Sequence, residues 1–236
     1  MEDMDVVYIC RSGPNEELRY SVRSVEKNLP HRKIWVVGQK PEWYKGNFLE
    51  VKDNNSKYAN ARNNLLALVD SEEISQDFIL MNDDFFIIRP VSKVNYFYEG
   101  TLDARAQKQE LLSTNGTYTR WLIQTAESLR ALGIDSPLNY ELHIPMVMNK
   151  DKLASVLKQK TSLWRSLYGN LYEVGGTEVQ DVKIYPNGVR EAQSYDWRGK
   201  TFPYISTQDA SFSFVHKSLL AEKFIHPSSI EDEDED

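Results

Sequence analysis

Two adjacent carboxylates and an amide interrupt an apolar run in the first half of the chain. Apolar residues fill positions 78–81 and 85–88, and Asn82, Asp83 and Asp84 lie between them. A short apolar run bounded by polar residues is typical of a buried strand. Carboxylates beside such a strand are costly to bury unless a cation or hydrogen-bond donors balance them. Because open α/β sheets bind ligands outside the carboxyl ends of their strands, these residues are the first candidates for a site.

The same three residues have a second interpretation. Asn-Asp is favourable turn chemistry, so the interruption is also compatible with a hairpin turn. The pattern alone favours a site over a turn. If it is a site, Asp83 and Asp84 offer oxygen ligands of the kind that Mg²⁺ or Mn²⁺ takes.

Several common kinds of site are missing from the sequence. No Gly-x-Gly-x-x-Gly follows the first predicted strand, and there is no Walker-type loop or Gly-x-Ser-x-Gly elbow. No two histidines stand at zinc spacing, and no cysteines cluster. Hard-cation chemistry at carboxylates therefore remains.

Composition indicates an ordinary globular protein. The 236 residues carry a formal net charge of −7, and the acidic run at 231–236 accounts for six of those charges. We predict a disordered tail there. The single cysteine, Cys10, favours a buried small hydrophobe over a nucleophile and fits a reducing compartment. With an acidic start and no apolar run near 18 residues, the expectation is a cytoplasmic protein without a membrane span.

Strands and helices alternate from the amino end. Residues 5–10 are β-branched and apolar, which is typical of a strand, and residues 33–37 repeat that pattern. Between them, residues 16–28 form a predicted helix, because apolar residues recur every three or four positions. A strand, a helix and a strand within about 35 residues form a right-handed βαβ unit with parallel strands. The fold class is therefore α/β.

The rest of the chain continues this pattern less regularly. We predict further strands at 48–51, 179–184, 202–206 and 212–215, and further helices at 59–69, 103–112, 119–132, 150–159, 162–168 and 217–224. No repeat and no long linker divides the chain. The prediction is a single domain over 1–230, with a helical insertion at about 103–170.

Four stretches resemble the first two conserved regions of the Stealth family of sugar-phosphate transferases. They are residues 5–8, 15–28, 33–43 and 78–86, in that order and spacing. The triplet His143-Ile144-Pro145 is similar to a third region, and residues 207–212 are similar to a fourth. The resemblance implies a GT-A-like, Rossmann-like nucleotide-sugar fold with a mixed, mostly parallel sheet.

The resemblance also implies a role for each candidate residue. The implied nucleotide-sugar ligands are Arg11, Ser12, Arg19, Arg23, Arg62, Asn82 and Arg165. The implied metal ligands are Asp83 and Asp84, with Mg²⁺ or Mn²⁺, and the implied catalytic residues are Asp84, His143 and Asp209. Plainer alternatives stay open: a solvated basic helix face for Arg19 and Arg23, a packed histidine for His143, a helix cap for Asp209, and a surface arginine beside a core Trp164 for Arg165.

The expected function is transfer of a sugar from a nucleotide-sugar to a hydroxyl acceptor. The acceptor is a glycan or, because some phage enzymes of this size glycosylate their own DNA, a modified base. Two alternatives stand beside it. One is Stealth-type transfer of a sugar 1-phosphate in polysaccharide synthesis, and the other is a binding protein with a degenerate site.

Overall fold

The computed structural model describes residues 4–53, 56–112, 116–159, 163–185 and 201–231, and the chain divides into two compact units. Unit 1 comprises Met1–Val94, His143–Pro145 and Val182–Asp236, and unit 2 comprises Asn95–Leu142 and Met146–Asp181. The predicted helical insertion at 103–170 falls in unit 2 apart from residues 143–145. We describe each unit by itself.

Parallel strands form the centre of unit 1. Their order is β3-β2-β1-β4, and their bounds are Asn47–Glu50, Ile34–Gly38, Asp5–Cys10 and Asp77–Met81. In the register, Val7 lies opposite Trp35 on one side and Leu80 on the other. Almost every residue of β1 and β2 is buried, as expected for parallel strands covered on both faces. The predicted α/β class with a mostly parallel sheet is confirmed.

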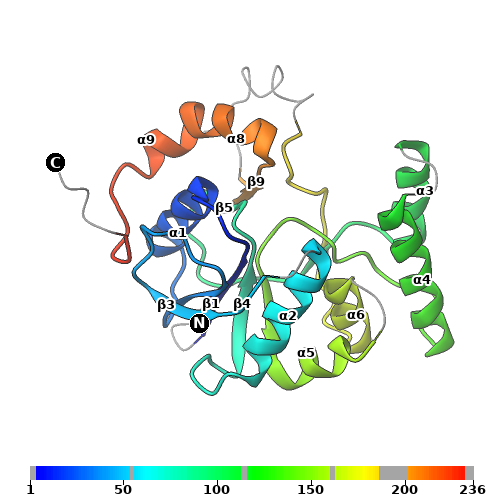
Figure 1. The fold of residues 1–236 in the computed structure, drawn as a ribbon. Helices are drawn as coiled ribbons and strands as arrows, with labels where there is room; N and C mark the ends of the chain where they lie inside the picture. The colour runs from blue at the N-terminus through cyan, green and yellow to red at the C-terminus, as the bar shows by residue number, and fades with distance from the viewer. Residues whose placement is uncertain (1–3, 54–55, 113–115, 160–162, 186–200, 232–236) are drawn as a thin grey trace. The chain divides into compact units, whose positions relative to one another are not determined.

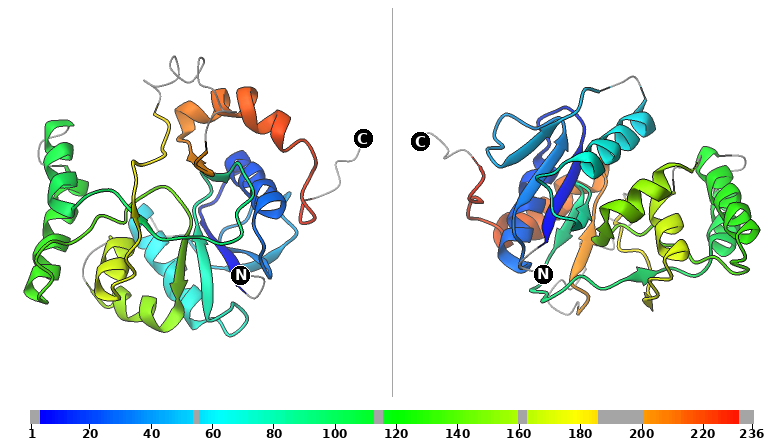
Figure 2. Two further views of the ribbon diagram at one scale, coloured as in Figure 1. Left: turned by 180° about the vertical axis from the view of Figure 1, so that it is seen from behind. Right: turned by 90° about the horizontal axis from the view of Figure 1, so that it is seen from below.

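Two helices cover opposite faces of these strands. Helix α1 (Glu16–Asn28) connects β1 to β2, and α2 (Lys57–Asp70) connects β3 to β4 (Figures 1 and 2). The chain builds outward from β1 to β3 and then returns to place β4 on the other side of β1. Crossovers between parallel strands are right-handed as a rule, so this reversal of direction is expected to put the helices on opposite faces. The carboxyl ends of β1 and β4 therefore form a topological switch point, where ligands of such folds bind.

Gly38 closes β2 for a steric reason. Its φ is +119°, and a Cβ there would lie 2.2 Å from the carbonyl oxygen of Cys10 and 2.5 Å from the side chain of Asn64. Only glycine fits this conformation and this close approach. The absence of a side chain lets Asn64 of α2 donate to the Cys10 carbonyl at 3.3 Å.

The second apolar run does not continue β4. Residues Phe85–Ile87 form a separate strand, β5, which pairs antiparallel with β9 (Tyr204–Ser206). Helix α1 holds β5 from the side, since Asn28 Nδ2 donates to the Ile87 carbonyl at 2.5 Å and Ser24 Oγ accepts from the Ile87 amide at 3.0 Å. A turn thus separates β4 from β5 at the Asn-Asp-Asp sequence.

The prediction of a strand at 212–215 is wrong. These residues belong to α8 (Asp209–Val215), which continues through a π-helical turn (His216–Leu220) into α9 (Ala221–Lys223). A capping box between Gln208 and Ser211 starts the helix. The alternating Phe-Ser-Phe-Val sequence has the pattern of a strand. In the helix, however, Phe212 stacks on Phe86 with 6.3 Å between ring centroids, and Val215, about one turn later, is buried.

The predicted strand at 179–184 is also wrong. The structure instead has β8 at Thr177–Glu178, together with an isolated bridge between Lys183 and Ser206. The apolar residues at 179, 182 and 184 are too interrupted by polar ones for a continuous ladder. The final predicted helix at 217–224 corresponds to the π-helical turn and α9.

Unit 2 is mainly helical. Its helices are α3 (Leu102–Leu112), α4 (Thr117–Ala131), α5 (Lys150–Leu157) and α6 (Trp164–Leu171), and its strands are β6 (Phe97–Tyr98), β7 (Met146–Asn149) and β8. Helices α3 and α4 lie side by side (Figure 2). The predicted helices of this region are thus confirmed, with shifted ends. Across the described ranges, we find no helix with the length and apolar character needed to span a membrane.

Candidate active site

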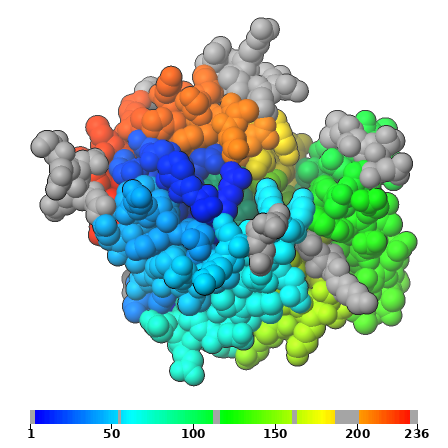
Figure 3. All heavy atoms as spheres, viewed as in Figure 1, coloured from blue at the N-terminus to red at the C-terminus, as the bar shows by residue number. Residues whose placement is uncertain are grey.

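A cavity of about 810 Å³ opens in unit 1 at the carboxyl ends of β1 and β4. It is bounded by the segment after β1, the turn after β4, the first turns of α2 and the start of α8. Figure 3 shows a hollow on this face of unit 1, where the blue, cyan and orange spheres meet. The polar or charged lining residues are Arg11, Ser12, Glu17, Asp53, Lys57, Asn60, Asn64, Asn82, Asp83, Asp84, His143, Lys183, Gln208 and Asp209.

The Asn-Asp-Asp sequence is both a turn and part of the cavity wall. The Phe85 amide donates to the Asn82 carbonyl at 3.2 Å, which closes a turn around Asp83 and Asp84. All three side chains line the cavity. The sequence therefore forms a turn, but not the turn of a hairpin, because β5 pairs with β9 and not with β4. The turn presents its side chains to the space beyond the sheet, and their role as a site stays a prediction.

Asp83 is fixed by the residue that caps α1. Asn15 lies in the left-handed region, with φ of 47°, and its Oδ1 accepts from the Leu18 amide at 3.1 Å. The Nδ2 of the same side chain donates to Asp83 Oδ2 at 2.8 Å. Burial and the neighbouring Asp84 carboxylate raise the pKa of Asp83, against this hydrogen bond. Asp83 is thus held in place by a neutral amide, and the negative charge of its ionised form is poorly compensated by its surroundings.

Asp84 has a cation beside it. Lys183 Nζ lies 2.7 Å from Asp84 Oδ2, and each side chain is only 14% exposed. Ser206 Oγ is 3.3 Å from the same oxygen, and the Thr207 amide donates to the Asp84 carbonyl at 3.1 Å. These contacts join the turn after β4 to β9, although more than one hundred residues separate them in the sequence.

Glu17 adds a carboxyl group with unusual acidity. Its Oε1 accepts from Thr207 Oγ1 at 2.7 Å. Burial, helped by the charges of Asp83, Asp84 and Asp209, raises the pKa of Glu17 to about 7 despite the Thr207 hydrogen bond. A carboxyl group with a pKa near neutrality is suited to accept or release a proton during a reaction.

The raised pKa of Glu17 predicts a pH-dependent stability. The folded protein keeps a proton on Glu17 that the unfolded chain loses near pH 4.5, so this group reduces the free energy of unfolding as pH rises from about 4.5 to about 7. We expect Glu17→Gln to be more stable than the wild type at pH 8 by about 1–2 kcal/mol, a value discounted for partial exposure, and equally stable at pH 4.

Urea unfolding of both proteins at the two pH values measures this effect. Glu16→Gln is the matched control, because Glu16 lies on the exposed side of the same helical turn. An equal difference between Glu17→Gln and the wild type at pH 4 and pH 8 would contradict the assignment.

The charges around the cavity fit a divalent cation. Five carboxyl groups and three cationic side chains line it, so its lining has an excess of acidic groups. No group of three or more His, Cys, Asp or Glu side chains in the described part of the chain is arranged to hold a metal ion by itself. Mg²⁺ sites in nucleotide enzymes commonly use one or two carboxylates and complete their shell with phosphate oxygens and water. Asp83 and Asp84 match that pattern.

Three of the seven predicted nucleotide-sugar ligands line this cavity. Arg11, Ser12 and Asn82 line it, as do the predicted catalytic residues His143 and Asp209. The His143 ring packs edge-on against Phe85, with 6.0 Å between centroids. Arg11 and Asp209 are 3.8 Å apart but 67% and 86% exposed, so their ion pair contributes little stability.

The other predicted ligands lie elsewhere. Arg19 and Arg23 are not in the cavity lining, because both bond to Glu231, whose side chain is 1% exposed. Glu231 is therefore folded into unit 1, which differs from the tail predicted to begin there; residues 232–236 lie outside the described residues. Arg62 also lies outside the cavity lining. Arg165 belongs to unit 2, where it donates to the Leu142 carbonyl at 2.9 Å.

Sequence reasoning missed Glu17, Lys183 and Asn15. Glu17 and Asn15 stand inside the stretch at 15–28 that resembles a conserved Stealth region, so that resemblance could have pointed to them. Lys183 carries no signal, because only the pairing with Ser206 brings it to Asp84. Cys10 is buried as predicted, and burial raises the pKa of its thiol well above the usual value, which opposes a nucleophilic role.

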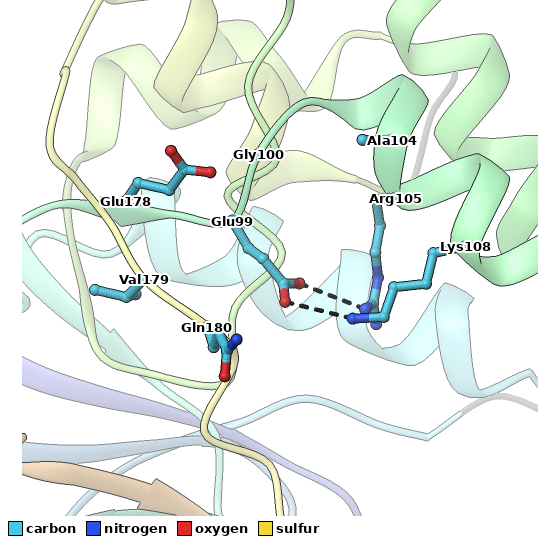
Figure 4. Close-up of a pocket in the computed structure, with 8 residues that line it drawn as sticks. All are labelled: Glu99, Gly100, Ala104, Arg105, Lys108, Glu178, Val179 and Gln180. Atoms are coloured by element: carbon cyan, nitrogen blue, oxygen red, sulfur yellow. Dashed lines mark hydrogen bonds and ion pairs between the residues drawn. The ribbon is translucent and has the colours of Figure 1, made fainter.

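Unit 2 has a smaller pocket of its own, of about 430 Å³ (Figure 4). Glu99 lies at its centre, 3.4 Å from Arg105 and 3.6 Å from Lys108. Glu178 and Gln180 line the opposite side. The pocket mixes acidic and basic groups that largely balance, and it contains none of the residues predicted to carry chemistry.

Comparisons with known proteins agree with the predicted resemblance. No family model matches the chain. An exopolysaccharide phosphotransferase of Streptomyces coelicolor is 32% identical over 103 residues, which cover 38% of this chain and 17% of that protein. The capsular polysaccharide phosphotransferase fcs1 of Haemophilus influenzae is 28% identical over 174 residues, which cover 64% of this chain and 48% of that protein. The resemblance to Stealth proteins is confirmed.

The chain spans less than half the length of either Stealth-like relative. Among solved structures, the glycosyltransferase GlyE of Streptococcus pneumoniae matches with a TM-score of 0.50 and 9% identity, over 95% of this chain and 60% of that one. This likeness concerns the fold alone. It agrees with the nucleotide-sugar transferase fold that the Stealth resemblance implies.

Proposed function

We propose that this chain is a Stealth-type transferase that moves a sugar 1-phosphate from a nucleotide-sugar donor to a hydroxyl acceptor. The observation that carries the proposal is the position of Asp83 and Asp84 in a cavity at the switch point between β1 and β4. The names of the two relatives, both polysaccharide phosphotransferases, favour transfer of the phosphate with the sugar. Transfer of the sugar alone is the second candidate.

The two candidates differ in the bond that breaks. In sugar-phosphate transfer, the acceptor oxygen bonds to the sugar-bearing phosphorus, the phosphoanhydride bond breaks, and a nucleoside monophosphate leaves. In glycosyl transfer, the acceptor oxygen bonds to the anomeric carbon and a nucleoside diphosphate leaves. In both cases the acceptor hydroxyl loses a proton to a base.

Residues of the cavity divide these tasks in our proposal. Asp83 and Asp84 would hold Mg²⁺ or Mn²⁺, and the bound cation would neutralise charge on the phosphates. Arg11, Ser12 and Asn82 contact the donor. Glu17, with a pKa of about 7, or His143 accepts the acceptor's proton, since both line the cavity. Asp209 lies at the exposed rim, where an acceptor would enter.

The acceptor is a glycan hydroxyl in this proposal, in line with the polysaccharide named for both relatives. A hydroxyl on a modified base of phage DNA is the alternative acceptor. The lone buried cysteine fits a reaction in the reducing cytoplasm.

Ligand-induced stabilisation tests donor and metal together. We expect one of UDP, GDP or CMP to raise the melting temperature of the chain in the presence of Mn²⁺, with a smaller rise when EDTA removes the metal, because a ligand that binds only the folded state stabilises it. A binding protein with a degenerate site would give the nucleotide shift without turnover. No shift with any combination of nucleotide and metal would refute the proposal.

The reaction products then separate the two kinds of transfer. Incubation with a panel of nucleotide-sugars and oligosaccharide acceptors should release a nucleoside monophosphate and give a product that retains one phosphate by mass spectrometry. Release of a nucleoside diphosphate with a phosphate-free product would assign the chain to glycosyl transfer instead.

A further inference from the structure

We infer that Lys183 is a phosphate-binding residue of the active site. One N–H group of its ammonium binds Asp84, and the other two are available to the diphosphate of the nucleotide-sugar. The inference rests on the proposed function and extends it to a residue that neither the sequence pattern nor the resemblance singles out. Its basis is the geometry around the Lys183 ammonium group.

Lys183 is held at the cavity by backbone contacts on both sides. It bridges to Ser206 of β9, and the Ile184 amide donates to the Ser206 carbonyl at 2.8 Å. Its side chain is 14% exposed and lines the cavity. The backbone of Lys183 is therefore fixed by its pairing with β9 rather than left free on a surface loop.

The Lys183 ammonium group has more N–H donors than its contact with Asp84 uses. A lysine carries three N–H donors, and within the described part of the chain the bonded partner of Lys183 Nζ is Asp84, at 2.7 Å. A partly buried cation with unused donors at the wall of a cavity suits the oxygen atoms of a phosphate, which lysine binds as a point charge.

The other cations of the cavity are less suited to this role. Arg11 is 67% exposed, and Lys57 is also exposed. Water and salt screen charges at such positions, whereas an ammonium group that is largely excluded from water keeps its attraction for an anion. Lys183 is therefore the cation of this lining that we expect to contribute most to phosphate binding.

Calorimetric titration with inorganic pyrophosphate, in EDTA and without nucleotide, tests the inference. Lys183→Met should weaken pyrophosphate binding by about tenfold or more, and Lys183→Arg should recover part of the loss. Lys57→Met, the exposed cation of the same lining, should change it by less than about threefold. Circular dichroism shows whether each variant is folded. If Lys183→Met does not fold, the comparison of Lys183→Arg with the wild type still tests the inference.

Asp84→Asn separates a ligand role from a merely structural ion pair. If Lys183 binds phosphate, Asp84→Asn removes a repelling carboxylate and should leave pyrophosphate affinity unchanged or higher. If the pair only shapes the cavity, both partners' variants should weaken binding alike, and that result would overturn the inference. So would wild-type affinity in Lys183→Met, or no pyrophosphate binding by the wild type. If the wild type binds pyrophosphate through Lys183 but turns over no nucleotide-sugar, that result would contradict the proposed function and still support an anion-binding site at Lys183.

Discussion

Replacing Asp84 with alanine should lower the rate of product formation by at least about a thousandfold, because the variant loses both a candidate metal ligand and the partner of Lys183. Asp84→Asn keeps the size of the side chain and should lose nearly as much, since the charge is what the site uses. Steady-state rates with saturating donor and Mn²⁺ measure the effect. Asp77→Asn, at the exposed opposite end of β4, is the matched control and should keep full activity.

The same substitution should also reduce stability. From the sequence alone, removal of one of two adjacent carboxylates would relieve repulsion and stabilise the fold. The structure predicts the opposite change, because the Lys183 side chain is only 14% exposed and Asp84→Ala leaves its ammonium group without a carboxylate. We expect a loss of about 1–3 kcal/mol in the free energy of unfolding, below the cost for a fully buried pair. An active, fully stable Asp84→Ala would rule out the assigned site.

Replacing Glu231 with alanine should destabilise unit 1 by about 3–5 kcal/mol, the usual cost of removing one partner from a buried ion pair. Glu231 accepts from Arg23 at 2.7 Å and 2.5 Å and from the Ser228 amide at 2.9 Å. Its loss leaves the guanidinium of Arg23, whose side chain is 9% exposed, without a carboxylate partner, and it removes one of the carboxylates that bind Arg19. Denaturant unfolding of the variant measures the change.

Two comparisons make the Glu231 prediction specific. Glu222→Ala removes an exposed carboxylate of α9 and should change stability by less than about 0.5 kcal/mol. Arg23→Met combined with Glu231→Met should recover part of the loss, because it leaves neither charge unpaired.

Burial alone would raise the pKa of Glu231, but hydrogen bonds from Arg23 and Ser228 lower it, so the contribution of the pair falls as pH drops below about 4.5.

Local patterns predicted the first half of the fold well. Strands β1 and β2 follow from their β-branched and apolar residues, and the helix between them follows from apolar periodicity. The Asn-Asp-Asp turn was found because buried carboxylates need an explanation. These features depend on neighbours in the sequence, which a single chain displays directly.

Long-range pairing explains what was missed. Arg19 and Arg23 look like a phosphate-binding pair from helix spacing, yet both turn to Glu231, about two hundred residues away. Lys183 reaches Asp84 only because the segment beside β9 returns to β5. The strand predicted at 212–215 became a helix because its capping residues and the packing of Phe212 outweigh β propensity.

The double role of Asn15 gives the molecule a built-in spectroscopic reporter. One end of its amide group accepts from the Leu18 backbone N–H, and the other donates to Asp83. Any ligand that draws Asp83 toward itself must lengthen or rotate this link. The nuclear magnetic resonance signal and the exchange rate of a single backbone proton, that of Leu18, would therefore register occupancy of the cavity without any label in the ligand.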